Sequence, residues 1–140
     1  MCTFAVESFD SVRNNGRIKF YKVLIDGNAQ IDSFVDEISK DKALEKEWKK
    51  VLACMDYVAE TNNKLPSQKL NSIKDGKKEI AVEFKSSTLR IYCFKKDPNV
   101  FIILGGYKKN QKDDINKLKR LLKVDKELVN TLEQLVSVAI

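Results

Sequence analysis

Basic and aromatic side chains that can bind a polyanion such as nucleic acid occur together in residues 79–111. Arg90 lies inside a run of apolar and aromatic residues, and Tyr107, Lys108 and Lys109 follow the last apolar run. An arginine presents a fixed fork of N–H donors to phosphate oxygens, whereas a lysine supplies a point charge. The chain has no histidine, which excludes Ser-His-Asp and Cys-His catalysis. Any proton transfer must therefore use Lys, Tyr, Asp, Glu or Cys.

The positive charge is unevenly distributed along the chain. The formal net charge is +6, but residues 64–123 contain sixteen Lys and Arg against six Asp and Glu, a net of +10. The remaining residues have a net charge of −4. A localised basic excess indicates a polyanionic partner, most simply nucleic acid. The alternative is a lysine-rich surface that is only solvated.

Cysteine usage and hydropathy limit the class of protein. The three cysteines, Cys2, Cys54 and Cys93, are odd in number and lack metal-ligand spacing, so we expect no disulfide framework, no metal and no other cofactor. No apolar run approaches the ~18 residues that span a bilayer. Residues 1–16 lack the basic segment and apolar core of a secretory signal. We therefore expect a cytoplasmic protein without a membrane partner.

The basic residues sit on, or just past, three β-type runs: 79–85, 89–94 and 100–104. The first alternates apolar and polar residues, as a half-buried strand does, and the third is apolar on both faces, as a central strand is. Short turns separate the runs, at residues 86–88 and 97–99. Consecutive strands with such short links are expected to form an antiparallel meander.

A strand and two helices are predicted before this sheet. Residues 18–25 are typical of a first strand. Apolar spacing predicts a helix that Asn28 caps, and a second helix that runs from an N-cap at Asp41 to about Glu60. The apolar positions are Ile31, Phe34, Val35 and Ile38 in the first helix and Leu44, Trp48, Val51, Leu52, Met55 and Val58 in the second. The second helix starts only a few residues after Ile38, the last apolar position of the first helix. Two helices joined by such a short link are expected to form an antiparallel hairpin.

The C-terminal part is predicted to be helical. Asp113 can cap a helix whose apolar positions are Ile115, Leu118, Leu121 and Leu122. We predict an α+β fold in which the helical hairpin packs on a small twisted antiparallel sheet, in the order β-αα-βββ-α. This domain spans residues 17–124, after an N-terminal extension, 1–16, with no convincing pattern. An amphipathic helix at 125–140 follows, and can pack on the domain, dimerise or bind another chain.

Four short motifs stand in order between Ile18 and Lys123. They are Lys69-Leu70 before the turn at Asp75-Gly76, Glu79-Ile80, Arg90-Ile91-Tyr92-Cys93-Phe94 and Gly106-Tyr107-Lys108-Lys109-Asn110-Gln111-Lys112. Their order and spacing resemble the RelE/ParE superfamily of type II toxin–antitoxin toxins. The resemblance is to the HigB-like branch in particular, which includes phage-derived relatives.

This resemblance implies a compact toxin that an antitoxin neutralises. In the RelE and HigB branches the toxin cleaves mRNA in the ribosomal A site, through attack of a ribose 2′-OH on the adjacent phosphate. The resemblance implies that Arg90 and Lys108 act on the phosphate and that Tyr107 stacks on a base or donates a proton. The further RNA-binding candidates are Lys69, Lys85, Tyr92, Lys95, Lys96, Lys109 and Gln111. Tyr92 shares a strand face with Arg90 by parity.

Departures from the family pattern leave other functions open. Ala81 and Glu83 stand where RelE has a catalytic lysine pair, and residues 112–140 contain no tyrosine to match the one near the RelE C-terminus. A non-catalytic RNA- or ribosome-binding protein of the same fold is one alternative. A gyrase inhibitor like those of the ParE branch is another. Arg90 itself can instead be a surface arginine that pairs with Glu79 or Glu83 on the adjacent strand.

Overall fold

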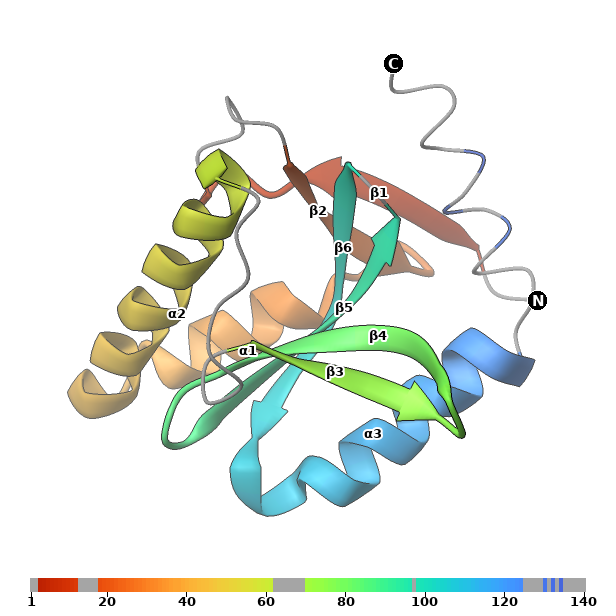
Figure 1. The fold of residues 1–140 in the computed structure, drawn as a ribbon. Helices are drawn as coiled ribbons and strands as arrows, with labels where there is room; N and C mark the ends of the chain where they lie inside the picture. The colour runs from red at the N-terminus through yellow and green to blue at the C-terminus, as the bar shows by residue number, and fades with distance from the viewer. Residues whose placement is uncertain are drawn as a thin grey trace.

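The computed structural model describes residues 3–12, 18–61, 70–96 and 98–124, together with Asn130, Leu132 and Gln134. Its main elements are β1 (Phe4–Ser8), β2 (Lys19–Ile25), α1 (Gln30–Ile38), α2 (Lys42–Thr61), β3 (Leu70–Asp75), β4 (Lys78–Lys85), β5 (Leu89–Lys96), β6 (Asn99–Tyr107) and α3 (Gln111–Lys119). A 3-10 turn, Lys108–Asn110, precedes α3 and a π-helical turn, Arg120–Val124, follows it. The predicted α+β class is confirmed (Figure 1).

The six strands form one sheet in the order β1-β2-β6-β5-β4-β3. The predicted antiparallel meander of β4, β5 and β6 is confirmed. The expectation of an entirely antiparallel sheet is wrong, because β2 pairs with β6 in the parallel direction. Both helices and three strands separate β2 from β6 in the chain. A connection of that length can return a strand in the parallel direction, which no two-residue hairpin can do.

Two edge strands were not predicted. Residues 1–16 show no convincing pattern, yet β1 pairs with β2 from Phe4 opposite Ile25 to Ser8 opposite Tyr21. We expected the segment before Gly76 only to lead into the sheet, yet it forms β3 and pairs with β4. Both strands are short and lie at the two edges of the sheet. Such strands depend on the ladder of a neighbour more than on their own residue types.

Helices cover the two faces of the sheet, α1 and α2 one face and α3 the other (Figure 1). The first face buries a core that includes Phe20, Phe34, Trp48, Met55, Phe84 and Ile102. The second face buries Tyr92, Phe101, Ile103, Leu104, Leu118 and Leu132. The central strand β6 contributes to both cores, as its apolar sequence predicts.

A bulge in β6 decides which face its last residues meet. The register shifts between Tyr92 and Cys93 of β5, whose partners are Leu104 and Ile102, so Ile103 is the extra residue. An extra residue reverses the alternation of side chains beyond it. Gly105 consequently faces α1 and Gly106 faces α3.

The cap predicted for α2 is confirmed. Asp41 Oδ1 accepts hydrogen bonds from the backbone N–H groups of Ala43, at 2.9 Å, and Leu44, at 3.3 Å. These donors have no partner within the first turn of a helix, so the side chain satisfies them. The predicted stripe of α2 also faces the first core, where Trp48 and Met55 are buried.

The caps predicted for the other two helices are wrong. Ala29 is the N-cap of α1, and Asn28 instead donates to the carbonyl of Asp26. Helix α3 begins at Gln111, so Asp113 lies within its first turn. An acidic residue there still interacts favourably with the helix dipole, which explains why the local sequence suggested a start.

Some predictions concern residues outside those described, namely Lys69, the turn at residues 14–16 and most of the C-terminal helix. Within 125–140 the structure describes Leu132, which is buried in the second core. No helix among the described residues is long and apolar enough to cross a membrane.

Candidate nucleic-acid interface

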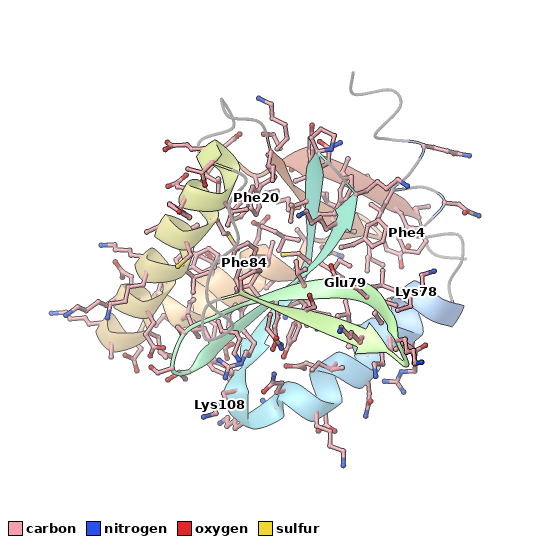
Figure 2. All side chains as sticks on the ribbon, in the orientation of Figure 1. Phe4, Phe20, Lys78, Glu79, Phe84 and Lys108 are labelled. Atoms are coloured by element: carbon pink, nitrogen blue, oxygen red, sulfur yellow. The ribbon has the colours of Figure 1, made fainter. Side chains whose placement is uncertain are left out.

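The basic residues at the ends of the strands, which include most of the predicted ones, form two groups at opposite ends of the sheet. One group lies where β4 and β6 end, at residues 85–88 and 107–109, and we call it the Lys108 end. The other lies where β4 begins and β5 ends, at residues 77–78 and 95–96, and we call it the Lys78 end. Figure 2 shows Lys78 and Lys108 far apart. Lys95 lies five positions after Arg90 in β5, which is about 17 Å along a strand.

A hollow open to solvent marks the Lys108 end. Its lining consists of Leu44, Ser87, Thr88, Tyr107, Lys108 and Lys109. Both lysines are exposed, whereas Tyr107 is half-buried. The hollow combines two cations, two hydroxyl groups and an aromatic ring. Single-stranded nucleic acid offers the matching groups, phosphates for the cations and bases for the ring.

The ring of Tyr107 is held in place by its neighbours. It packs edge-on against Phe34 of α1, with 5.3 Å between ring centroids. Lys109 Nζ lies 5.7 Å from the centroid of the Tyr107 ring, within the range of a cation–π interaction. Burial raises the pKa of Tyr107, and so does its hydrogen bond to Glu37. The hydroxyl therefore stays protonated at neutral pH and acts as a donor.

The backbone of β6 is tied to the β4–β5 turn at this end. The N–H of Lys108 donates to the carbonyl of Thr88 at 2.7 Å, and Leu89 pairs with Tyr107 across the ladder. Lys85 ends β4 beside the same turn and is partly exposed. The turn and the two lysines after β6 thus form one unit.

Arg90 is turned into the protein. It is 5% exposed and lies opposite Gly106 on the face that α3 covers. Its Nη1 donates to the carbonyls of Ser86, at 2.6 Å, and Leu89, at 2.8 Å. Neither of the expected carboxylate partners, Glu79 or Glu83, forms an ion pair with Arg90 within the described ranges. The guanidinium fixes the β4–β5 turn in this structure, and its contact with phosphate stays a prediction.

Other polar side chains are buried beside Arg90 under α3. Glu83 is 1% exposed and accepts hydrogen bonds from Gln111 Nε2, at 3.1 Å to both oxygens, and from Asn71 Nδ2, at 3.4 Å. Tyr92 is fully buried on the same face as Arg90, as parity predicted. Burial raises the pKa of Tyr92 far above its usual value, and the charges of Asp114 and Glu83 add to that effect.

The structure therefore brings together only part of the predicted set. Tyr107, Lys108 and Lys109 line one hollow, with Lys85 next to it. Tyr92 is fully buried and the half-buried Gln111 donates to Glu83, while Lys95 and Lys96 are exposed at the Lys78 end. The lining residues that we did not predict are Leu44, Ser87 and Thr88. In the sequence, the β4–β5 turn that supplies Ser87 and Thr88 is marked by three consecutive residues with hydroxyl groups, 86–88.

Residues 39–131 match the family model described as Phage derived protein Gp49-like (DUF891). The match covers more than half of the chain and includes α2, α3 and every strand from β3 to β6. The chain belongs to the Gp49-like family. This is a RelE/HigB-like toxin family, associated with the toxins of toxin–antitoxin systems. No curated protein matches the chain, and no solved structure matches it either.

Membership of the Gp49-like family confirms the superfamily that the four motifs suggested. The association of this family with toxin–antitoxin systems suggests an antitoxin as a partner. The side chains that line the hollow, and the polar side chains Glu83, Arg90 and Tyr92 buried under α3, lie within the matched residues. The first three elements, β1, β2 and α1, precede the match.

Proposed function

We propose that this Gp49-like protein is the toxin of a type II toxin–antitoxin system, of the HigB-like branch, and that it cleaves mRNA on the ribosome. The observation that supports this best is the hollow at the Lys108 end, where two exposed lysines flank an aromatic ring within a toxin-family segment. Translation is then the process that it inhibits. It acts in the cytoplasm, and an antitoxin neutralises it.

The reaction is transfer of a phosphodiester bond within the RNA. The ribose 2′-oxygen bonds to the adjacent phosphorus while the bond to the 5′-oxygen breaks, which leaves a 2′,3′-cyclic phosphate and a 5′-hydroxyl. The proton of the 2′-hydroxyl passes to water. Lysines are positively charged at neutral pH, so Lys108 and Lys109 offset the negative charge that develops on the phosphate. Lys108 donates a proton to the leaving 5′-oxygen, and Tyr107 stacks on a base.

The buried cluster under α3 favours a second candidate function, RNA or ribosome binding without cleavage. Ala81 and Glu83 take the positions of the RelE lysine pair, and both are buried. Arg90 is enclosed with them. A positioned acid or base typically contributes ~10²–10⁴-fold to a reaction rate. A protein that lacks these groups at its surface can keep its basic hollow and bind RNA without cleaving it.

Toeprinting of mRNA on translating ribosomes tests the proposal. We expect wild type to cut within the A-site codon and the double variant Lys108→Ala/Lys109→Ala to lose the cuts. The matched control is Lys95→Ala/Lys96→Ala, which removes the same charge from the Lys78 end and should still cut. Arg90→Ala shows whether the enclosed guanidinium is needed as well.

Other outcomes separate the alternatives. Intact mRNA with wild type, together with ribosome binding that weakens steeply as salt rises, would establish the non-catalytic function. Inhibition of DNA supercoiling by gyrase, with translation unaffected, would identify a ParE-like inhibitor. If wild type neither binds ribosomes nor slows translation, the proposal fails.

A further inference from the structure

A single carboxylate holds the β4–β5 turn that lines the hollow at the Lys108 end. Glu47 lies in α2, and its Oε1 accepts hydrogen bonds from Ser86 Oγ at 2.5 Å, Ser87 Oγ at 3.0 Å and the N–H of Thr88 at 2.8 Å. Each residue of the turn thus donates to the same oxygen. About forty residues of chain separate Glu47 from its partners, so this contact joins two distant elements.

The turn is itself hydrogen-bonded to Lys108 and Arg90, the two basic residues predicted to act on the phosphate. The carbonyl of Thr88 accepts from the N–H of Lys108 at 2.7 Å, and the carbonyl of Ser86 accepts from Arg90 Nη1 at 2.6 Å. Any change in the path of the turn therefore moves the backbone of Lys108 and the support of Arg90.

Glu47 lies in a part of α2 that is packed firmly against the first core. It precedes Trp48, which is buried in the first core with Val51 and Met55 of the same helix. Burial disfavours the charged form of Glu47, but the hydrogen bonds from Ser86, Thr88 and Ser87 outweigh burial and lower its pKa. A charged acceptor makes stronger hydrogen bonds than a neutral one, so the turn is held firmly.

We infer that Glu47 is a positioning residue for the RNA site, which holds the β4–β5 turn so that Lys108 meets the phosphate. This inference rests on the proposed function, because it assigns a role within the proposed site. Glu47 does not touch the RNA. It acts through Thr88 and Ser86, and it is not among the residues that line the hollow.

The chain offers a matched series of variants. Glu47→Ala removes all three hydrogen bonds, whereas Glu47→Gln keeps an amide oxygen in the place of Oε1. Glu45→Ala is the control, because Glu45 is in the same helix and its ion pair is with Lys49, at 3.5 Å. Ser86→Ala/Ser87→Ala removes two donors from the other side of the contact, and serves if α2 variants fail to fold.

Two measurements are made on each variant. The first is hydrogen exchange at the amides of Thr88 and Lys108, which needs no activity. The second is single-turnover cleavage of mRNA on programmed ribosomes at increasing concentrations of the variant. It gives the cleavage rate at saturation separately from the protein concentration at half-saturation. Misplacement of a catalytic group by about 1 Å can cost about 10²-fold in rate.

We expect Glu47→Ala to speed exchange at both amides and to lower the saturating rate by about 10–100-fold, with little change in half-saturation. Glu47→Gln should recover most of the rate, and Glu45→Ala should match wild type. Unchanged exchange at Thr88 and Lys108 in Glu47→Ala would overturn the inference about Glu47 and leave the proposed function standing. So would faster exchange with an unchanged rate, or a Gln variant as slow as the Ala variant. Wild type that cleaves nothing would overturn the proposed function, and the positioning role of Glu47 with it.

Discussion

Gly105 and Gly106 are consecutive in β6, yet they meet the helices on opposite faces of the sheet. A Cβ added to Gly105 would collide with the ring of Phe34 in α1, and one added to Gly106 would collide with Oδ2 of Asp114 in α3. An aromatic ring thus packs against β6 on the first face, and a carboxylate packs against it on the second. The two faces of one strand are built from different chemistry.

This contrast extends beyond the glycines. On the first face Gln30 satisfies both backbone groups of Gly105, donating to its carbonyl at 2.9 Å and accepting from its N–H at 2.7 Å. On the second face Arg90 Nε and the Tyr92 hydroxyl are buried without a hydrogen-bond partner among the described residues. A buried polar group left unpaired costs about 1–3 kcal/mol. Both faces bury an apolar core, but the second also retains unpaired polar atoms at a cost to stability.

The largest expected effect comes from comparing Gly105→Ala with Gly106→Ala. Gly105→Ala forces a methyl group against a ring packed in the core, and overpacking of this kind costs about 1–3 kcal/mol. Gly106→Ala meets the end of an Asp114 side chain that is only partly buried and can turn toward solvent. We expect its free energy of unfolding in urea to change by less than about 1 kcal/mol. Equal losses for the two variants would show that α3 is held as firmly as α1.

A smaller effect is expected for Tyr92→Phe. The substitution removes a buried hydroxyl that has no partner among the described residues and keeps the ring. Because the unpaired group costs stability, we expect the free energy of unfolding to rise by about 1 kcal/mol. Urea titration measures it, with Tyr107→Phe as the comparison, since Tyr107 has Glu37 as its partner and should lose stability. A less stable Tyr92→Phe would contradict our view of the second face.

Local sequence predicted the parts of the fold that local interactions decide. Helix α1 and helix α2 follow from their apolar stripes, and β4, β5 and β6 follow from β-type runs separated by short turns. The half-buried character expected of β4 is wrong, because Ala81–Phe84 are all buried. What could not be predicted depends on distant partners. Strand β1 exists because β2 offers it a ladder, and the parallel pairing of β2 with β6 joins residues about eighty positions apart.

The candidate site divides in the same way. Tyr107, Lys108 and Lys109 are neighbours in sequence, so their place in one hollow was predictable. The position of Lys95 at the opposite end was implied by the length of β5, since eight residues extend about 26 Å. The enclosure of Arg90 was not, because it depends on how α3 packs. Nor was the role of Glu47, whose partners are three residues of a remote turn.

The smallest expected effect concerns the rim of the first face, where its polar contacts lie. Lys22 of β2 donates to Asp32 of α1 at 2.8 Å and lies 3.6 Å from Glu7 of β1. The hydrogen bond to Asp32 raises the pKa of Lys22 above 10.5, against a smaller opposing effect of burial. Partly exposed ion pairs contribute about 0.2–1 kcal/mol, so Lys22→Met should cost no more than that at pH 7.

The pH dependence of that loss has a definite sign. A raised pKa in the folded state means that the stability from Lys22 is fully present below the unfolded pKa, near 10.5, and is lost as pH rises through the folded pKa. The difference in free energy of unfolding between wild type and Lys22→Met should therefore be constant from about pH 7 to 9 and shrink above about pH 10.5. Urea titrations of both proteins across that range measure it. A difference that stays constant through about pH 11 would mean that Lys22 stabilises the rim by packing rather than by charge, and one that grows with pH would mean that burial outweighs the hydrogen bond to Asp32.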